Sequence, residues 1–96
     1  MLCIRSSGLH FSKLAMSFFY VYILQADQMP ERFYIGLTED LKQRLVKHNA
    51  GEVPHTAEFK PWRIKTAIAF TNRTRAAEFE RYLKSPSGRA FAKKRL

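Results

Sequence analysis

Two aromatic and β-branched runs, separated by a short polar segment, constrain the fold of this chain most strongly. Residues 18–24 and 33–37 both have the composition of buried strands. The segment between them, residues 25–32, contains Asp27 and Pro30, which are typical of turns. We therefore expect a β-hairpin in which the second run pairs back on the first.

The segment after the hairpin predicts a helix and then a loop. Thr38 can cap a helix over about residues 39–49, and Gly51 is placed to end it. Pro54 and Pro61 interrupt the residues after this glycine, so we expect a loop there.

The C-terminal part predicts one more strand and further helix. Residues 62–70 alternate in part between apolar and polar side chains, which favours a third strand. Thr71 or Asn72 can cap a second helix that runs to about Lys84. The next four residues contain proline and glycine and should break it. Residues 89–96 are expected to form a short basic helix or tail.

The order of these elements predicts a small α+β domain, with a three-stranded, mostly antiparallel sheet flanked by helices. The chain has 96 residues, which suits a single domain over residues 16–96. Residues 1–15 lack acids and any clear apolar period. We expect them to be a disordered leader or an over-called start, with Met16 as the natural first residue.

Positive charge is concentrated in the C-terminal part of the chain. The net charge is +9 and the pI is about 10.1. Of the 17 lysines and arginines, 11 lie between Lys60 and Leu96, where the only acids are Glu78 and Glu80. A solvated basic surface would account for the excess, but clustered bases at this pI favour a polyanion, nucleic acid before an anionic membrane surface.

Several other classes of protein are excluded. Cys3 is the only cysteine, so one chain can form neither a disulfide framework nor a cysteine zinc site. The histidines, His10, His48 and His55, lack the spacing of zinc ligands on a helix. No apolar run is long enough to span a bilayer. A cytoplasmic protein is the simplest expectation.

The hairpin carries the first candidate site residues. Side chains alternate along strands, so a suitable register would bring Tyr22 and Tyr34 onto one face. Gly36, on the same face as Tyr34, would allow close approach of backbone or substrate. Taken alone, the two tyrosines are better explained as ordinary core aromatics, because aromatic residues are common in strands.

The two predicted helices carry the others. Leu41, Leu45 and Val46 would form the apolar side of the first helix, and Arg44 and His48 would project together along its edge. An arginine there suits a phosphate, although it could also extend its charge into solvent.

In the second helix, Ala76, Phe79 and Leu83 form the apolar stripe. Glu80 lies at the edge of that stripe, whereas Glu78 points away, so Glu80 is the better metal ligand. An i,i+4 ion pair between Glu80 and Lys84 is the alternative.

Together these residues resemble the GIY-YIG nuclease superfamily, especially its small stand-alone bacterial members, over about residues 18–96. Arginine eight residues after the glycine, followed by histidine and glutamate, makes the combination specific. The matching motifs are Tyr20-Val21-Tyr22 (Tyr20 replaces a glycine), Tyr34-Ile35-Gly36, Thr38-Glu39-Asp40-Leu41, Arg44-Leu45, His48-Asn49, Glu80, Lys84-Ser85 and Gly88-Arg89-Ala90-Phe91.

The resemblance implies metal-dependent hydrolysis of phosphodiester bonds, in DNA rather than RNA, for repair or recombination. Glu80 would hold one Mg²⁺ or Mn²⁺, and Arg44 would bind the scissile phosphate. Tyr22 would orient or deprotonate the attacking water, with His48 as a competing base and Tyr34 as a positioning group. A base role requires a Tyr22 pKa below the usual value of about 10. The bases expected to follow the nucleic-acid backbone are Lys60, Arg63, Lys84, Arg89, Lys93 and Lys94.

Two other functions stay open. The chain could be a nucleic-acid-binding module with little or no nuclease activity, since larger relatives add separate DNA-binding domains. A basic protein docked on a membrane or ribosome would explain the charge, but not Tyr22, Arg44 and Glu80 together. We expect a nucleic-acid partner and no membrane, and a homodimer or a partner protein is compatible with the site.

Overall fold

A single antiparallel sheet forms the centre of the fold. The computed structural model describes residues 17–96, so the leader expected in residues 1–15 lies outside the described residues. Strands β1 (Phe19–Ala26), β2 (Phe33–Thr38) and β3 (Trp62–Phe70) are arranged in the order β2-β1-β3. The predicted hairpin, third strand and α+β class are confirmed.

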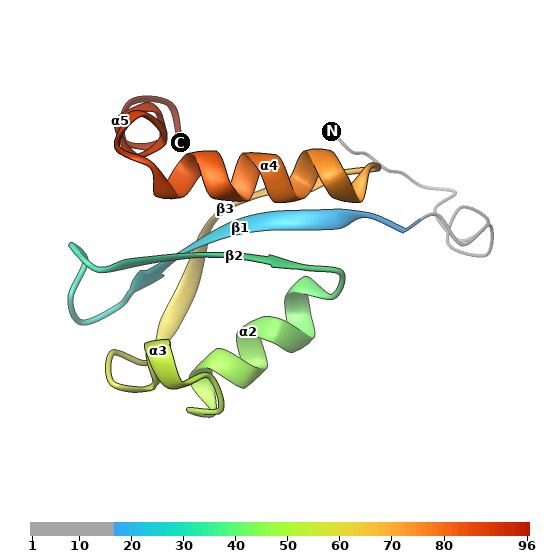
Figure 1. Cartoon of the computed structure of the whole chain (residues 1–96). Coiled ribbons are helices and arrows are strands. Elements are labelled where there is room, and N and C mark those ends of the chain that lie inside the picture. Colours follow the sequence, from blue (N-terminus) through green and yellow to red (C-terminus); the bar gives the residue numbers. More distant parts are fainter. Residues whose placement is uncertain (1–16) are drawn as a thin grey trace, which may run out of the picture.

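Helices cover both faces of this sheet. Helix α4 (Arg73–Lys84) runs along one face, while α2 (Leu41–Asn49) and the one-turn helix α3 (Pro54–Ala57) lie on the other (Figure 1). Helix α5 (Pro86–Arg95) packs at the end of α4. Within residues 17–96, none of the helices combines the length and apolar character that crossing a membrane requires.

Alternation along β1 produces the two halves of the core. Val21 and Ile23 face α4 and pack with its Ala76 and Leu83. The intervening even-numbered residues of β1 face the other side, where Tyr22, Leu24, Ala26 and Trp62 form a second buried cluster under α2. The same strand therefore carries Tyr22 toward α2 and anchors the helix that bears Glu80.

Helix α2 begins two residues later than predicted. Its cap is Asp40, whose carboxylate accepts a hydrogen bond from the Gln43 N–H at 3.0 Å. Thr38 instead accepts a hydrogen bond from the Asp40 N–H at 3.1 Å. A carboxylate at this position satisfies an otherwise unpaired N–H of the first turn, and it displaces the earlier threonine. Gly51, with a φ of 79°, ends the helix as predicted.

The inward face of α2 also differs from the prediction at one position. Leu41 and Leu45 pack toward the second cluster, but Val46 is 62% exposed. The third inward position is taken by His48, which is fully buried. Residues 41, 45 and 48 lie at i, i+4 and i+7 and share one face, from which Val46 is rotated away.

Two further segments are more helical than expected. The loop predicted around Pro54 contains α3, with Pro54 in its first turn. Asn72 caps α4 as predicted. The segment after α4, predicted to break the helix, turns the chain directly into α5, because Ser85 caps that helix and Pro86 occupies its first position.

Candidate active site

The phenol of Tyr22 lies at the centre of the candidate site. Tyr22 pairs with Gly36 across the hairpin and is 1% exposed. A Cβ at Gly36 would collide with the Tyr22 ring and hydroxyl, so only glycine leaves room for the ring over β2. The Tyr34 ring lies on the same side, with its centroid 6.4 Å from that of Tyr22, as the predicted shared face requires.

His48 connects this phenol to the protein interior. Its Nε2 lies 2.9 Å from the Tyr22 hydroxyl oxygen, and its Nδ1 lies 2.8 Å from Thr56 Oγ1. The Tyr34 ring packs edge-on against the imidazole at 5.0 Å between centroids. Both ring nitrogens of His48 are therefore hydrogen-bonded inside a fully buried environment.

Arg44 lies half-buried, one turn before His48 on α2, and acts on both groups. Burial lowers the pKa of His48 from its ordinary value of 6.5, and the Arg44 charge lowers it further. Burial raises the pKa of Tyr22 to about 12, with Tyr34 and Glu80 adding to the rise and Arg44 opposing it. The lowered value that a tyrosine base requires is therefore not present, and the imidazole is neutral at pH 7.

Glu80 approaches the site from the opposite face of the sheet. Its side chain is 23% exposed, whereas Glu78 points into solvent, as the stripe of α4 predicts. The charge of Glu80 is close enough to Tyr22 to raise the pKa of the phenol. One carboxylate oxygen pairs with Lys84 Nζ at 3.0 Å. The i,i+4 ion pair considered from the sequence is thus present.

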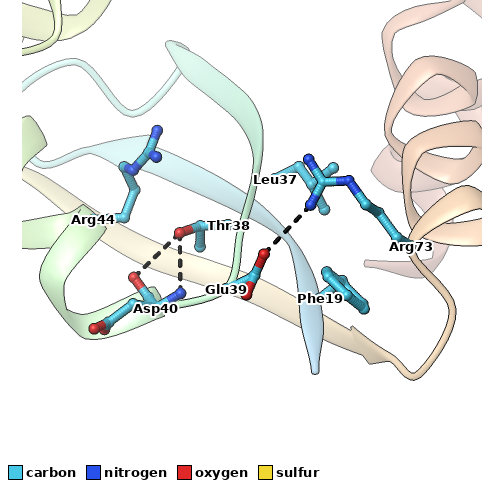
Figure 2. A pocket seen from close by; sticks show the side chains of 7 residues that line it. All are labelled: Phe19, Leu37, Thr38, Glu39, Asp40, Arg44 and Arg73. Atoms are coloured by element: carbon cyan, nitrogen blue, oxygen red, sulfur yellow. Dashed lines mark hydrogen bonds and ion pairs between the residues drawn. The ribbon is translucent and has the colours of Figure 1, made fainter. Parts of the chain in front are cut away.

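A hollow of about 320 Å³ opens beside Arg44 (Figure 2). Arg44 borders it on one side and Arg73 of α4 on the other, with Glu39 between them. An Arg73 guanidinium nitrogen lies 3.4 Å from a Glu39 carboxylate oxygen. Both side chains are largely exposed, so the attraction between them is weak. Phe19 and Leu37 supply apolar lining.

The bases predicted to follow nucleic acid lie in two places. At the start of β3, the Arg63 guanidinium donates hydrogen bonds to the Asp27 carboxylate at 2.6 Å and to the Gln25 side-chain oxygen at 2.9 Å. Lys60 lies near the same place and donates to the Ala57 carbonyl at 3.5 Å. Helices α4 and α5 carry the exposed remainder, Lys84, Arg89, Lys93 and Lys94 (Figure 1).

Three residues outside the predicted site residues support this site, although one of them, Asn49, stands in the His48-Asn49 motif. Asn49 donates to the Trp62 carbonyl at 3.0 Å and accepts from the Trp62 N–H at 2.6 Å. The Trp62 indole N–H donates to the Thr56 carbonyl at 2.8 Å. These bonds fix α3 against the end of α2, where Thr56 meets His48. A buried histidine must find two partners, but nothing in the spacing indicates which residues supply them.

Comparison with protein families identifies the family of this chain. The sequence profile of the GIY-YIG catalytic domain matches residues 18–95. The chain belongs to the GIY-YIG catalytic domain family. Residues 18–95 include each candidate site residue that the structure brings together, from Tyr22 to Glu80.

Individual relatives of this GIY-YIG chain are named structure-specific endonuclease subunits. It is 41% identical over 71 residues to the SLX1 subunit of Scheffersomyces stipitis, covering 67% of this chain and 21% of that protein. It is 38% identical over 76 residues to SLX1 of Meyerozyma guilliermondii, and the match covers 72% of this chain and 25% of that protein. The SLX1 homolog of Giardia intestinalis is 31% identical over 65 residues, and the match covers 64% of this chain and 18% of that protein. This chain therefore spans about a quarter or less of these relatives.

The buried imidazole of this GIY-YIG domain should make its stability depend on pH. The folded pKa of His48 lies below 6.5, so between the two values the unfolded state binds more protons. The free energy of unfolding should be highest above pH 6.5, and it should fall as the pH drops from 6.5 toward the pKa of His48 in the folded state. Melting temperatures measured from pH 5 to 8 should show this fall, and His48→Gln should reduce it. If the melting temperature fell equally with pH in the unmodified protein and in His48→Gln, this account would be contradicted.

Proposed function

We propose that this GIY-YIG domain is a metal-dependent endonuclease that hydrolyses phosphodiester bonds in DNA, at branched structures formed during repair or recombination. The observation that carries the proposal is that a cation and a carboxylate from helices on opposite faces of the sheet both act on one buried phenol. Tyr22 comes from β1, Arg44 from α2 and Glu80 from α4, and both charges act on the Tyr22 phenol. The preference for branched DNA rests on relatives named structure-specific endonuclease subunits.

The residues present fit one hard divalent ion, Mg²⁺ or Mn²⁺. GIY-YIG nucleases generally depend on a divalent metal. Within residues 17–96 there is no group of three or more His, Cys, Asp or Glu side chains that could enclose a metal. Glu80 is a single, mostly buried carboxylate, and such a ligand with water and phosphate oxygens suffices for Mg²⁺. When bound, the ion would stabilise negative charge on the phosphate and the leaving oxygen.

Arg44 is the group best suited to bind the scissile phosphate. It lies beside Tyr22 and borders the hollow in Figure 2, through which a nucleic-acid backbone could approach. A guanidinium donates two parallel hydrogen bonds to phosphate oxygens and stays charged at every relevant pH. Its donors would stabilise the charge that grows on the phosphate during attack.

The Tyr22–His48 pair is the route for the proton of the attacking water. The raised pKa makes a free phenolate an unfavourable base, whereas neutral His48 can accept a proton. Tyr22 would orient the water, pass its own hydroxyl proton to His48 Nε2 and take a proton from the water in return. One O–H bond of the water breaks as its oxygen bonds to phosphorus. The bond from phosphorus to the leaving oxygen breaks, and that oxygen takes a proton from solvent. Tyr34, packed against the imidazole, would help to position water or phosphate.

Affinity for DNA would come from the exposed bases. Lys93, Lys94 and Arg89 extend along α5, and Lys60 and Arg63 flank the start of β3. Contacts from such residues to phosphates strengthen binding without reading sequence, and they weaken as salt rises. Relatives of this chain are named as subunits, which supports the additional proposal that a partner protein assists it. A homodimer is the other arrangement compatible with so small a domain.

The alternative is a nucleic-acid-binding module with little or no nuclease activity. The ion pair of Glu80 with Lys84 favours this alternative, because it occupies the predicted metal ligand. The full chain should be tested on branched, duplex and single-stranded DNA with Mg²⁺ or Mn²⁺, with matching RNA substrates. We expect metal-dependent cleavage, strongest on branched DNA. Salt-sensitive binding without cleavage in either metal would favour the alternative, and preference for RNA would contradict the proposed substrate.

A further inference from the structure

A buried hydroxyl group, that of Thr56, lies against His48. Thr56 is fully buried in α3, and its Oγ1 lies 2.8 Å from His48 Nδ1. The same hydroxyl donates to the Val53 carbonyl at 3.2 Å. A hydroxyl has one hydrogen, so once this hydrogen points to Val53 the oxygen can only accept from His48.

Nδ1 of His48 must then be the ring nitrogen that carries the hydrogen. In a neutral imidazole one nitrogen donates and the other accepts, so Nε2 is left with a lone pair. That lone pair faces the Tyr22 hydroxyl oxygen at 2.9 Å, and Tyr22 must be the donor in this bond. The opposite tautomer would point an Nε2–H at the Tyr22 oxygen, and His48 could then not accept its proton.

The surroundings keep Thr56 in place for this task. The Trp62 indole binds the Thr56 carbonyl at 2.8 Å, and Asn49, the neighbour of His48, binds both polar backbone groups of Trp62. Within residues 17–96, every buried side-chain nitrogen and oxygen has a hydrogen-bond partner. The network is therefore complete, and a change at the Thr56 hydroxyl would leave His48 Nδ1 unpaired in the interior.

We propose that Thr56 is a positioning residue that holds His48 as the Nδ1–H tautomer and so keeps Nε2 available to the Tyr22 hydroxyl. The inference rests on the proposed function for its catalytic consequence. Thr56 acts through His48 and touches neither water nor phosphate. With Nε2 as acceptor, Tyr22 can pass its proton to His48 as it takes one from the attacking water. With the other tautomer, this transfer is blocked.

The test has a spectroscopic arm and a kinetic arm. Long-range proton–nitrogen NMR correlations on the full chain report which ring nitrogen of His48 is protonated, without any need for activity. We expect Nδ1–H in the unmodified protein and in Thr56→Ser, which keeps the hydroxyl. Thr56→Val should shift His48 toward Nε2–H and lower kcat on branched DNA by about 100-fold, with KM unchanged. Thr56→Ser should stay within a few-fold of the unmodified rate.

Several outcomes would overturn the proposal. An Nε2–H tautomer in the unmodified protein would refute it, whatever the rates. An Nδ1–H tautomer and a normal kcat in Thr56→Val would refute it as well. If Thr56→Val does not fold, Thr56→Ala is read by the same two criteria. If the unmodified chain does not cleave DNA, the proposed function fails, but the tautomer measurement still tests the role of Thr56.

Discussion

Replacing Glu80 with glutamine is expected to lower cleavage by about a thousandfold or more, because this side chain is the single carboxylate proposed to hold the metal. Glutamine keeps the size of the side chain and removes its charge. The Lys84 partner is 53% exposed, so loss of this ion pair should change folding stability only slightly. DNA binding through the exposed bases should persist. Cleavage rate, melting temperature and Mn²⁺ binding by electron paramagnetic resonance measure the three effects separately.

Glu78→Gln is the matched control for this experiment. Glu78 lies on the same helix two positions earlier, but it is exposed to solvent. The control removes the same charge from α4 and should leave both cleavage and Mn²⁺ binding within a few-fold of the unmodified protein. Full cleavage by Glu80→Gln would show that another group holds the metal. Equal losses in the two variants would point to the charge of the helix rather than to a ligand.

Patterns along single elements predicted most of the fold. Aromatic and β-branched composition located β1 and β2, and partial alternation of apolar and polar residues located β3. The alternation of side chains along the hairpin strands placed Tyr22 and Tyr34 on one face. The stripe of α4 distinguished the partly buried Glu80 from Glu78. These predictions succeed because the periods of strands and helices determine which side chains share a face.

Local competition explains the errors in the fold. At the start of α2, two residues with capping side chains lie two positions apart, and the carboxylate of Asp40 provides the cap in place of Thr38. Helix α4 ends at Lys84 as predicted, but the next helix begins at Pro86, after the Ser85 cap, and not at about residue 89, because proline is well suited to the first turn of a helix. In both cases the residue types indicated a helix, but they did not determine the residue at which it begins.

Contacts between distant segments could not be predicted. Thr56 is eight residues from His48, in a segment expected to be a loop. The helix that carries it has a single turn, which is too short to show a helical spacing of apolar residues in the sequence. The raised pKa of Tyr22 depends on burial and on Tyr34 and Glu80, which only the assembled fold brings near. The family resemblance indicated Tyr22 and His48 as separate candidates, but the fold joins them by a hydrogen bond.

Arg44→Ala should lower kcat by about 10²- to 10³-fold, the loss typical for removal of one donor to a developing negative charge. Arg44→Lys keeps the charge but loses the two parallel donors, so it should restore only part of this loss. Arg81→Lys, at an exposed position of α4, is the control for a general effect of replacing arginine, and it should cleave normally.

The same Arg44 variant makes a prediction that does not depend on catalysis. Arg44 lowers the pKa of both His48 and Tyr22. Removing this positive charge favours the protonated imidazole and disfavours the phenolate, so both pKa values should rise in Arg44→Ala. NMR titration of His48 between pH 4 and 8 would detect the first change, with Arg81→Ala as the matched control. An unchanged His48 pKa in Arg44→Ala would show that the guanidinium is not electrostatically coupled to the pair, and would weaken the case that Arg44 and Tyr22 act in one site.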